Sequence, residues 1–555
     1  MPKNQENHAP KKESVIRKWA PVFVLSLALA IILIDSTLLN VSLATLVKDL
    51  NTDIQSLQWV ITAYTLTIAA LTITGGRLGD LFGRKKMFIT GAALFAVGSF
   101  IASISTNVST MIIGESIIEG IGAALMMPAT ASLLVSKYHG RDRGIAFGIW
   151  GGVAAASTAI GPLLGGYLTT YYSWRWGFRI NVVVAAILIL GSFIIKEYRE
   201  SGIKMKLDFT GVLLSAAGMF SLVYGIIEAS TYGWWTAKIP YSLWGKNYQL
   251  WGYSITPFAI GLGIAILTAF LLWERRIEKL GRTPLVSLHL FSNRPYLSSV
   301  ATTAIFALGQ AGLIFSIPVF MQAVRGASAF ETGLALIPMS ITALFMAPLA
   351  GFLSHKIAPK IMVQVGLAAF VAGYLIVYLT LNVNTTASDL VIPFVILGLG
   401  MGMMMSSISN MTLSAVSPEQ AGEASGVNNT MRQVGATLGT AIIGAVMLTA
   451  INTNLVSGIN SSAIIPSAFK QNADKIVSQQ TSNVEFGGGA HIPGTVPLKI
   501  RNEITSISHT AITDANREAL GYAIIFGIVG LFSTIWLPSG TNIDFAANVA
   551  KRKTS

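Results

Sequence analysis

The sequence contains no cysteine and few charged residues. Without cysteine, disulfides and thiolate metal sites are excluded. Charged residues make up only 11% of the 555, whereas soluble proteins carry roughly a quarter. Apolar residues make up 52%. We therefore expect most of the chain to lie in lipid.

Motifs of several enzyme and pump classes are also missing. The sequence shows no Gly-x-x-x-x-Gly-Lys-Ser/Thr phosphate loop, no spacing typical of a metal site, and no nucleophile elbow in a strand–helix context. We expect no enzyme activity, no ATP-driven pump of the phosphate-loop type, no metal and no cofactor. The net charge of +13 is explained below by loop topology, so we do not expect nucleic-acid binding.

Fourteen apolar runs are long enough to cross a bilayer, which takes about 20 residues of helix. Only helices and closed barrels satisfy the backbone in hydrocarbon, and these runs are continuous rather than alternating, which rejects a barrel. The runs lie near 20–43, 56–75, 87–106, 110–136, 144–169, 177–196, 208–229, 255–273, 297–322, 331–354, 361–381, 389–413, 424–450 and 519–537. The sequence predicts an all-α polytopic membrane protein.

Lysine and arginine concentrate in alternate loops, which fixes the expected orientation. Basic residues stay on the cytoplasmic side of a membrane. If the N-terminus is inside, the basic clusters at 84–86 and 551–553 fall inside, while the opposite loops carry few charges apart from the long one after 450. We expect a multi-pass protein of the inner (plasma) membrane with both termini cytoplasmic.

The spans divide as six, two and six. A short repeat supports two related halves, because 76–85 and 351–360 share Gly, Leu and a final Lys in equivalent loops. The predicted parts are a cytoplasmic tail 1–19, a six-helix bundle 20–200, two inserted helices with a linker 201–290, a second six-helix bundle 291–540 that includes an outer loop 451–518, and a cytoplasmic tail 541–555.

Three acids, Asp35, Glu115 and Glu119, lie within the predicted spans and away from their ends. Asp35 falls near the middle of the first run, where a charge is costly, so an acid there predicts function. Glu115 and Glu119 lie four residues apart and share one helix face. Two like charges in low dielectric cannot both ionise cheaply, so we expect the pair to titrate as a unit with at least one proton bound. The alternative is a set of protonated, hydrogen-bonded packing acids.

The loop after the second run combines glycine with charge, in Gly76, Arg77, Gly79, Asp80, Gly83 and Arg84. Its glycines allow close approach and a tight turn. We expect a gate latch in which Asp80 binds Arg84 or a facing helix N-terminus, with Arg77 in the same network. The alternative is charge that only fixes topology.

Small residues and a proline occur together in the fifth run, in Gly161, Pro162, Gly165 and Gly166. Small residues four apart let helices touch closely, and Pro162 frees a carbonyl and bends the helix. The pattern favours a tight, bendable contact between the bundles. The alternative is an ordinary packing seam.

Four residues are candidates for a substrate cavity: Asn40, Tyr64, Met126 and Arg432. Arg432 lies inside a span and needs either a partner or a watery cavity. Tyr64 is also typical of an interfacial anchor. The methionines at 401 and 403–405 favour core filling, although flexible thioethers also suit a promiscuous pocket.

Several of these segments resemble one family. The loop 76–86 resembles motif A of the major facilitator superfamily, and 161–166 is similar to its motif C. The segments 34–41, 174–181 and 426–435 look like those of its fourteen-span drug:proton antiporters. The resemblance runs from about residue 20 to about 540 and implies a major facilitator fold of two six-helix bundles plus two inserted helices.

The resemblance also implies a function. It implies a proton-coupled secondary antiporter that exports lipophilic drugs or toxic compounds, which we expect to be cationic, by alternating access. The expected partners are the small-molecule substrate, protons and the bilayer, and the chain is expected to act as a monomer. Asp35, Glu115 and Glu119 would surround one cavity and exchange protons for the substrate.

Two positions of the fourth span depart from the family pattern. The fourth span usually carries an Arg, with a Gln three residues later, but here Ser116 and Glu119 occupy these positions. The cation that would modulate the proton site is missing. The alternatives are a major facilitator transporter for another solute, such as a lipid, sugar or organic anion, or else a channel or membrane enzyme. Saturable flux that depends on a pH gradient favours a transporter, and ohmic conductance favours a channel.

Overall fold

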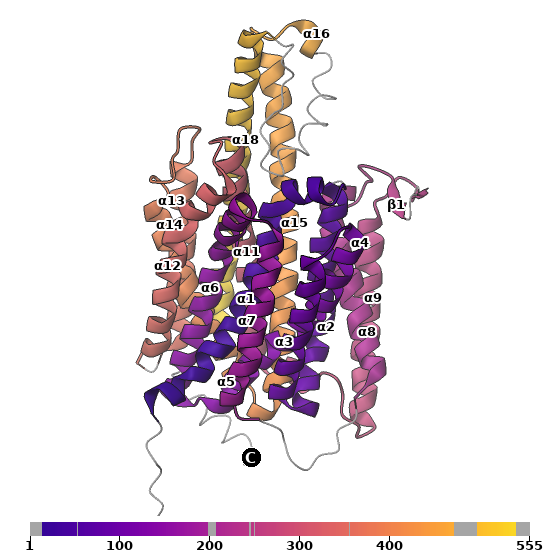
Figure 1. Ribbon diagram of the computed structural model, residues 1–555, viewed down its shortest axis with the longest axis vertical. Coiled ribbons are helices and arrows are strands. Elements are labelled where there is room, and N and C mark those ends of the chain that lie inside the picture. Colours follow the sequence, from indigo (N-terminus) through magenta and orange to yellow (C-terminus); the bar gives the residue numbers. More distant parts are fainter. Residues whose placement is uncertain are drawn as a thin grey trace, which may run out of the picture.

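The computed structural model describes residues 14–52, 54–197, 207–243, 246–248, 250–354, 356–470 and 497–539. Over these residues the protein is almost entirely helical (Figure 1), as the apolar runs predict. The predicted tail 541–555 and most of the tail 1–19 lie outside the described residues.

Each predicted run coincides with one or more helices, and several helices extend beyond their runs, α15 and α18 most of all. The first group comprises α1 (Val15–Asp49), α2 (Ile54–Phe82), α3 (Arg84–Ser103), α4 (Val108–Met111), the π-helix η1 (Ile112–Glu119), α5 (Gly120–Lys137), α6 (Gly140–Tyr171), α7 (Arg175–Gly191) and the 3-10 turn η2 (Ser192–Ile194). The second comprises α8 (Phe209–Tyr232), α9 (Ile255–Lys279) and α10 (His289–Ser292). The third comprises α11 (Arg294–Ala323), α12 (Ala329–Leu353), α13 (Pro359–Thr380), α14 (Val391–Ser414), η3 (Pro418–Gln420), α15 (Ala421–Ser461), α16 (Ser467–Lys470), α18 (Leu498–Ser533) and η4 (Thr534–Trp536).

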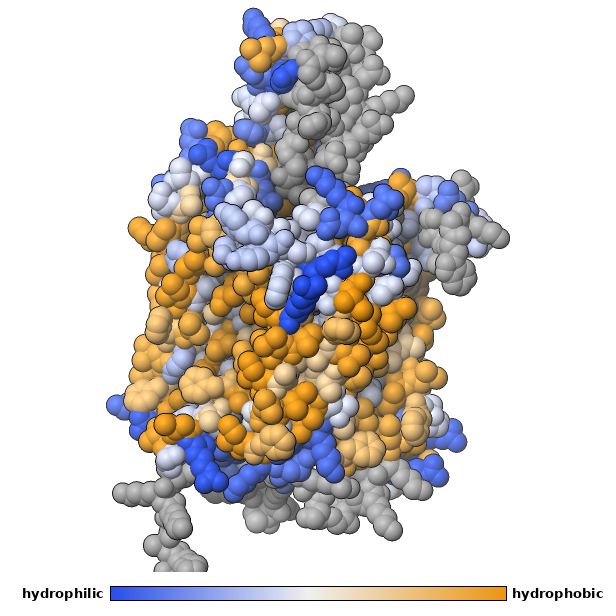
Figure 2. Space-filling model, in the orientation of Figure 1, coloured by the Kyte–Doolittle hydropathy of each residue, from blue (hydrophilic) through white to orange (hydrophobic). Residues whose placement is uncertain are grey.

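Twelve helices of the described chain are long and apolar enough to span a membrane, and the bent helix α6 makes up to thirteen. The remaining predicted run, 297–322, coincides with α11. The number fourteen therefore stays a prediction. Figure 2 shows an apolar belt on one face of the molecule, bounded by hydrophilic residues at both ends, as lipid requires.

The helices form two packed groups that meet along their length. One apolar cluster is built mainly from α1–α7 and another from α11–α18. The groups touch most extensively where α6 packs on α12, and also where α2 packs on α15. Helices α8 and α9 pack on each other, and α8 also contacts α2 and α15. We call the end of the bundle at which α1 begins and α18 ends the terminal end; it lies at the bottom of Figure 1. The predicted domain boundaries stay predictions.

A short antiparallel hairpin joins α8 to α9 at the end opposite the terminal end (Figure 1). Its strands are β1 (Tyr241–Leu243) and β2 (Lys246–Tyr248), in which Tyr241 pairs with Tyr248. No strand was predicted from the sequence here.

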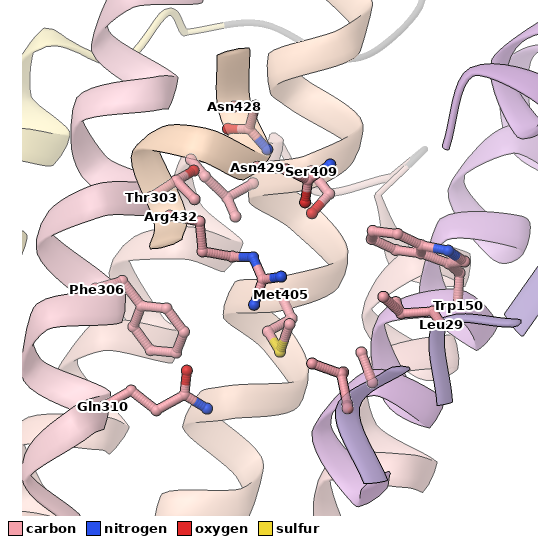
Figure 3. Close-up of a pocket in the computed structure, with 13 residues that line it drawn as sticks. Leu29, Trp150, Thr303, Phe306, Gln310, Met405, Ser409, Asn428, Asn429 and Arg432 are labelled. Atoms are coloured by element: carbon pink, nitrogen blue, oxygen red, sulfur yellow. The ribbon is translucent and has the colours of Figure 1, made fainter. Parts of the chain in front are cut away.

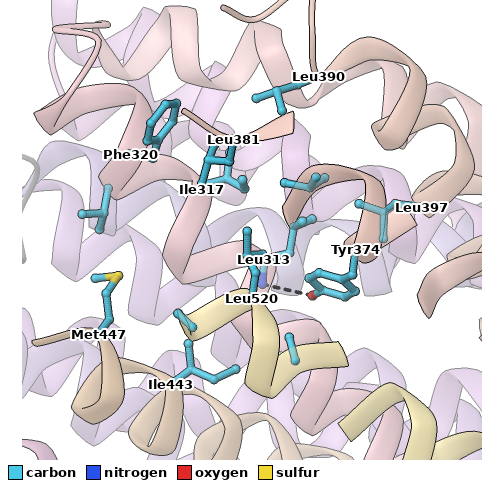
Figure 4. Packing of buried hydrophobic residues seen from close by; sticks show 14 of the residues in the cluster. Leu313, Ile317, Phe320, Tyr374, Leu381, Leu390, Leu397, Ile443, Met447 and Leu520 are labelled. Atoms are coloured by element: carbon cyan, nitrogen blue, oxygen red, sulfur yellow. Dashed lines mark hydrogen bonds between the residues drawn. The ribbon is translucent and has the colours of Figure 1, made fainter. Parts of the chain in front are cut away.

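The core of the second group includes one tyrosine hydroxyl that reaches into a helix backbone. In Figure 4, the Tyr374 hydroxyl of α13 accepts a hydrogen bond from the amide of Leu313 at 3.1 Å. The same hydroxyl donates to the carbonyl of Gly309 at 2.8 Å. The hydroxyl thus bonds both the N–H and the C=O of one i to i−4 backbone pair of α11, and it links α13 to α11.

The predicted outer loop 451–518, whose order the sequence left open, is helical at both of its ends. Helix α15 has 41 residues, about 60 Å at about 1.5 Å per residue, twice the roughly 30 Å of hydrocarbon. The extensions of α15 and α18 project together beyond the bundle (Figure 1). Ile451, Leu455 and Ile459 recur every four residues and join the apolar cluster that also contacts Ile504 and Ile507. This buried stripe explains why a segment rich in Ser, Asn and Thr is helical. The segment 471–496 lies outside the described residues.

Candidate functional site

Asp35, at the centre of the first helix, and Glu119, in the fourth span, share one hydrogen-bond donor, the side chain of Asn181. The side-chain amide of Asn181, in α7, donates to Asp35 Oδ1 at 2.6 Å and to Glu119 Oε1 at 3.2 Å. Asp35 is 1% exposed and Glu119 is fully buried. One amide group therefore joins two carboxyls from helices far apart in sequence.

Glu115 completes the buried acid group. It is fully buried, and neither of its carboxyl oxygens has a hydrogen-bond partner in the described structure. It lies in the π-helix η1, which ends at Glu119. Short π-helical segments occur often at functional sites. The second oxygens of Asp35 and Glu119 are likewise unpartnered. We call Asp35, Glu115, Glu119 and Asn181 the carboxyl cluster.

The carboxyl cluster contains no cation. Ion pairs among the described residues include Lys18–Asp142, Arg77–Glu423, Arg84–Asp80 and Arg517–Asp514, and none of these four involves the cluster. Ser116, at the position where the family has Arg, is fully buried, and its hydroxyl donates to the Val60 carbonyl at 2.7 Å. Among the described residues no group of acids, His and Cys is arranged to hold a metal.

The Asp80–Arg84 pair joins the two helix groups at the terminal end. Arg84 Nη2 lies 2.9 Å from Asp80 Oδ1 and donates to the Pro418 carbonyl at 2.6 Å. Asp80 Oδ2 accepts the backbone N–H of Glu423 at 3.0 Å, at the N-terminus of α15. A carboxylate is stabilised there by free N–H groups and by the helix dipole. The contacts predicted for Asp80, with Arg84 and with a facing helix N-terminus, are both present.

Glu423 extends this network and was not predicted as a site residue. It pairs with Arg77 at 3.6 Å and accepts the Ser287 amide at 2.6 Å, so it links α2, α15 and the segment before α11. We call Arg77, Asp80, Arg84 and Glu423 the latch. An acid at the start of an apolar run was the only sequence signal for Glu423.

Glycines make the latch possible in two ways. A side chain at Gly76 would collide with the Gly422 carbonyl of α15, so the helices approach closely only with glycine there. Gly83 has a φ of 111°, and a Cβ there would lie 2.8 Å from the Glu197 carboxylate. Glu197 in turn accepts the amides of Lys85 and Lys86, at the start of α3. A Cβ at Gly79 would make only an ordinary contact with Arg84 at 3.7 Å.

The glycines of the fifth run pack α6 against α1. A Cβ at Gly161 would collide with the Thr37 hydroxyl, and one at Gly165 would lie 3.1 Å from Leu38. Gly166 is buried as well. The segments Gly140–Ser157 and Ile160–Tyr171 meet at 42°, which matches the bend predicted for Pro162. The close contact is thus between two helices of the first group, whereas the small-residue pattern predicted a contact between bundles. The contact of α6 with the second bundle involves other glycines, for example Gly144 against Gly351 of α12.

A cavity lies between the two helix groups (Figure 3). Its empty space is about 470 Å³, part of which is open solvent. It is lined by Leu29, Leu33, Trp150, Ala154, Thr303, Phe306, Gln310, Met405, Ile408, Ser409, Asn428, Asn429 and Arg432. We call it the central cavity.

Of the four residues predicted to line a substrate cavity, one lines the central cavity. Arg432 lines the central cavity, but Tyr64 and Met126 do not. Tyr64 is 2% exposed, and its hydroxyl has no partner in the described structure; it lies within electrostatic range of the three acids. Met126 is fully buried and packs beside Gly91 of α3. The side chain of Asn40 lies outside the described residues.

Helix α1 connects the cavity, the carboxyl cluster and the α6 contact. Leu33 faces the central cavity, and Asp35, two residues on, is turned by about 200° to the opposite side of the helix. Thr37 then meets Gly161. The three acids are not part of the cavity lining, so a substrate in the cavity and a proton on the cluster would act on different faces of one helix.

Comparison with known proteins gives a consistent picture. The sequence model of the Major Facilitator Superfamily matches residues 25–440. The tetracenomycin C resistance and export protein of Streptomyces glaucescens is 27% identical over 95% of this chain and 93% of its own. The multidrug transporter protein MdtP of Bacillus subtilis is 24% identical over 91% and 90%. The proton:xylose symporter XylE is similar in fold, with a TM-score of 0.55 and 11% identity over 95% of this chain and 97% of its own.

Proposed function

We propose that this chain, which belongs to the Major Facilitator Superfamily, exports lipophilic compounds in exchange for protons by alternating access. Membership confirms the resemblance predicted from the motifs, and the chain is a transporter rather than an enzyme. Its relatives include proteins named for antibiotic export and multidrug transport. Proton coupling and antiport are part of the proposal.

One observation carries the proton-coupling proposal: three carboxyls are buried within the membrane-spanning region without any cation. Asn181 supplies two donor contacts for the three acids. Ionised carboxylates without partners are costly in such surroundings, so a proton bound to the cluster stabilises this arrangement. Loss of a proton would favour an arrangement with other partners or with water. Because Asp35 of the cluster lies on α1, that change would act on the helix that also lines the central cavity.

The latch supports alternating access. It joins the two helix groups at the terminal end through Arg84 with Pro418 and Asp80 with Glu423. We propose that this is the state closed to the cytoplasm, and that the latch opens when the cavity faces inward. The terminal end is then the cytoplasmic side of the inner (plasma) membrane, and fourteen spans place both termini there.

The charge of the substrate is not part of this proposal. The three acids were the reason to expect a cation, and they do not line the central cavity. We retain the monomer as the working oligomeric state. A transporter for another solute class is the second candidate, favoured by the fold match to a sugar symporter, but the relatives similar over nearly the whole chain are named for drug export.

The proposal can be tested in cells that lack background efflux pumps. A panel of lipophilic antibiotics and dyes of both charges is screened for export, with and without a protonophore. We expect saturable export of at least one compound, and we expect that export to stop when the proton gradient is collapsed. Export that continues without a proton gradient, or an ohmic conductance in place of saturable flux, contradicts the proposal.

A further inference from the structure

The central cavity is lined by Arg432, for which the described part of the chain supplies no ion-pair partner. The Arg432 guanidinium donates from Nη2 to the sulfur of Met127, a weak acceptor, at 3.9 Å. None of the ion pairs among the described residues includes Arg432. Arginine stays protonated in proteins and carries five N–H donors. The Arg432 side chain is part-buried, and a guanidinium shielded from water without an acceptor is costly, so an acceptor that enters the cavity would be stabilised by it.

The rest of the lining does not neutralise this charge. It contains no acidic residue, and its polar members are Thr303, Gln310, Ser409, Asn428 and Asn429. The Asn429 amide already donates to the Ser425 carbonyl at 3.0 Å, and the Thr303 hydroxyl to the Ser299 carbonyl at 2.9 Å. The cavity therefore offers a net positive group and uncharged neighbours.

Aromatic side chains line the central cavity together with Arg432. Figure 3 shows Arg432 between Phe306 of α11 and Trp150 of α6 in this view. Trp150 is fixed in place, because its indole N–H donates to the Thr130 hydroxyl at 3.3 Å and its ring meets Phe147 edge-on at 5.9 Å. Flat apolar rings favour flat apolar ligands. Met405 adds an adaptable wall.

We propose that the central cavity binds aromatic compounds that carry a carboxylate or a comparable anionic oxygen, with Arg432 as the residue that binds the oxygen. A guanidinium matches such a group with two parallel hydrogen bonds. The inference rests on the proposed export function and names its substrate class. It replaces the expected cationic substrate, because the carboxyls that suggested a cation lie on the other side of α1.

The test uses two probes with the same ring and opposite charges. One is pyrene with a short chain ending in a carboxylate, and the other is pyrene with the same chain ending in trimethylammonium. Binding to purified protein in lipid nanodiscs is measured by fluorescence. We expect the carboxylate to bind at least about ten-fold more tightly, as a charge-assisted hydrogen bond implies. Arg432→Gln should remove that preference, and Arg432→Lys should retain part of it.

Two further variants separate the effect from misfolding. Met431→Gln changes the exposed neighbour of Arg432 and should leave both affinities unchanged. Asn428→Asp places an acid one helical turn before Arg432, so that an internal ion pair forms and the preference moves toward the ammonium probe. The inference is overturned if the ammonium probe binds wild-type protein as tightly as the carboxylate, or if folded Arg432→Gln binds the carboxylate with unchanged affinity.

The same probes distinguish this inference from the export function. Proteoliposomes with a pH gradient report transport of each probe. Gradient-driven transport of the ammonium probe that is insensitive to Arg432→Gln contradicts the substrate class but supports proton-coupled export. Charge-selective binding that depends on Arg432, without gradient-driven flux of either probe, supports the site and contradicts the export function.

Discussion

Asn181 donates its side-chain amide to Asp35 Oδ1 at 2.6 Å, and thereby ties α7 to the acid at the centre of α1. The same amide reaches Glu119 at 3.2 Å. An amide can donate to a carboxyl whether or not that carboxyl holds a proton, so Asn181 can keep the two acids together through a protonation cycle. This makes Asn181 a positioning residue for the proposed proton site.

Replacement of Asn181 should therefore uncouple transport from the gradient. Loss of a buried donor to carboxyls costs about 1.5–3 kcal/mol, so we expect Asn181→Leu to lower gradient-driven transport by about ten-fold or more. Substrate binding should be unchanged, because Asn181 is outside the central cavity. Asn181→Ser keeps a donor and should retain part of the coupling. Flux in proteoliposomes and binding in nanodiscs measure the two effects, and equal losses in both would contradict the positioning role.

Opening of the latch should change the conformational equilibrium. Asp80→Asn weakens the contacts with Arg84 and with the N-terminus of α15. We therefore expect the fraction of molecules in which the two helix groups are separated at the terminal end to rise about ten-fold. Because the chain has no cysteine, spin labels can be attached specifically to the two cysteines of a variant with Lys86→Cys and Lys356→Cys. The distance between the two labels is then measured by pulsed electron paramagnetic resonance.

The control for the latch is Lys85→Gln, which changes a neighbouring charge that no ion pair of the described residues uses. It should leave the distance distribution as in the wild type. If Asp80→Asn also leaves it unchanged, the latch does not hold the terminal end closed.

The contact between α6 and α1 should tolerate no side chain at its tightest point. Gly161→Ala places a Cβ against the Thr37 hydroxyl, and overpacking of this kind costs typically 1–3 kcal/mol. We expect a lower melting temperature and slower transport, with partial recovery in the double variant with Thr37→Ala. Gly261→Ala in α9 is the control, because open space surrounds that position. If Gly161→Ala changed neither the melting temperature nor the transport rate, this would show that α1 and α6 separate easily.

The sequence predicted much of this architecture and some of its contacts. Counting along the first run was enough to place Asp35 at depth, and glycine spacing with one charge pair predicted the contacts of Asp80. Asn181 was missed because its role depends on packing between helices that are distant in sequence. The charge balance of Arg432 also became visible only with the cavity around it.

The helices at the two ends of the predicted outer loop were missed for a different reason. Ile451, Leu455 and Ile459 already had the spacing of a helix stripe in the sequence, but the polar composition around them favoured a loop. The stripe matters only because α18 supplies a partner face. No pattern in the sequence predicted that η1 is a π-helix.

The projecting part of α15 should be stabilised by that stripe. Leu455→Ser removes a side chain that is 6% exposed, which should cost about 2–4 kcal/mol locally. Hydrogen exchange of residues 451–461 should become faster, while exchange of the membrane-spanning part stays slow. Ser457→Ala, on the exposed side, is the matched control. Unchanged exchange in Leu455→Ser would mean that the extension is not held by α18.

Proton coupling by the carboxyl cluster is tested most directly in proteoliposomes that contain the combined variant Asp35→Asn, Glu115→Gln and Glu119→Gln. Uptake of a known substrate against its gradient, driven by a pH difference, is recorded together with the substrate-dependent movement of protons. We predict that uphill uptake and proton movement both fall to background, while binding and downhill exchange of substrate persist. Uphill, gradient-driven uptake at the wild-type rate would contradict the account.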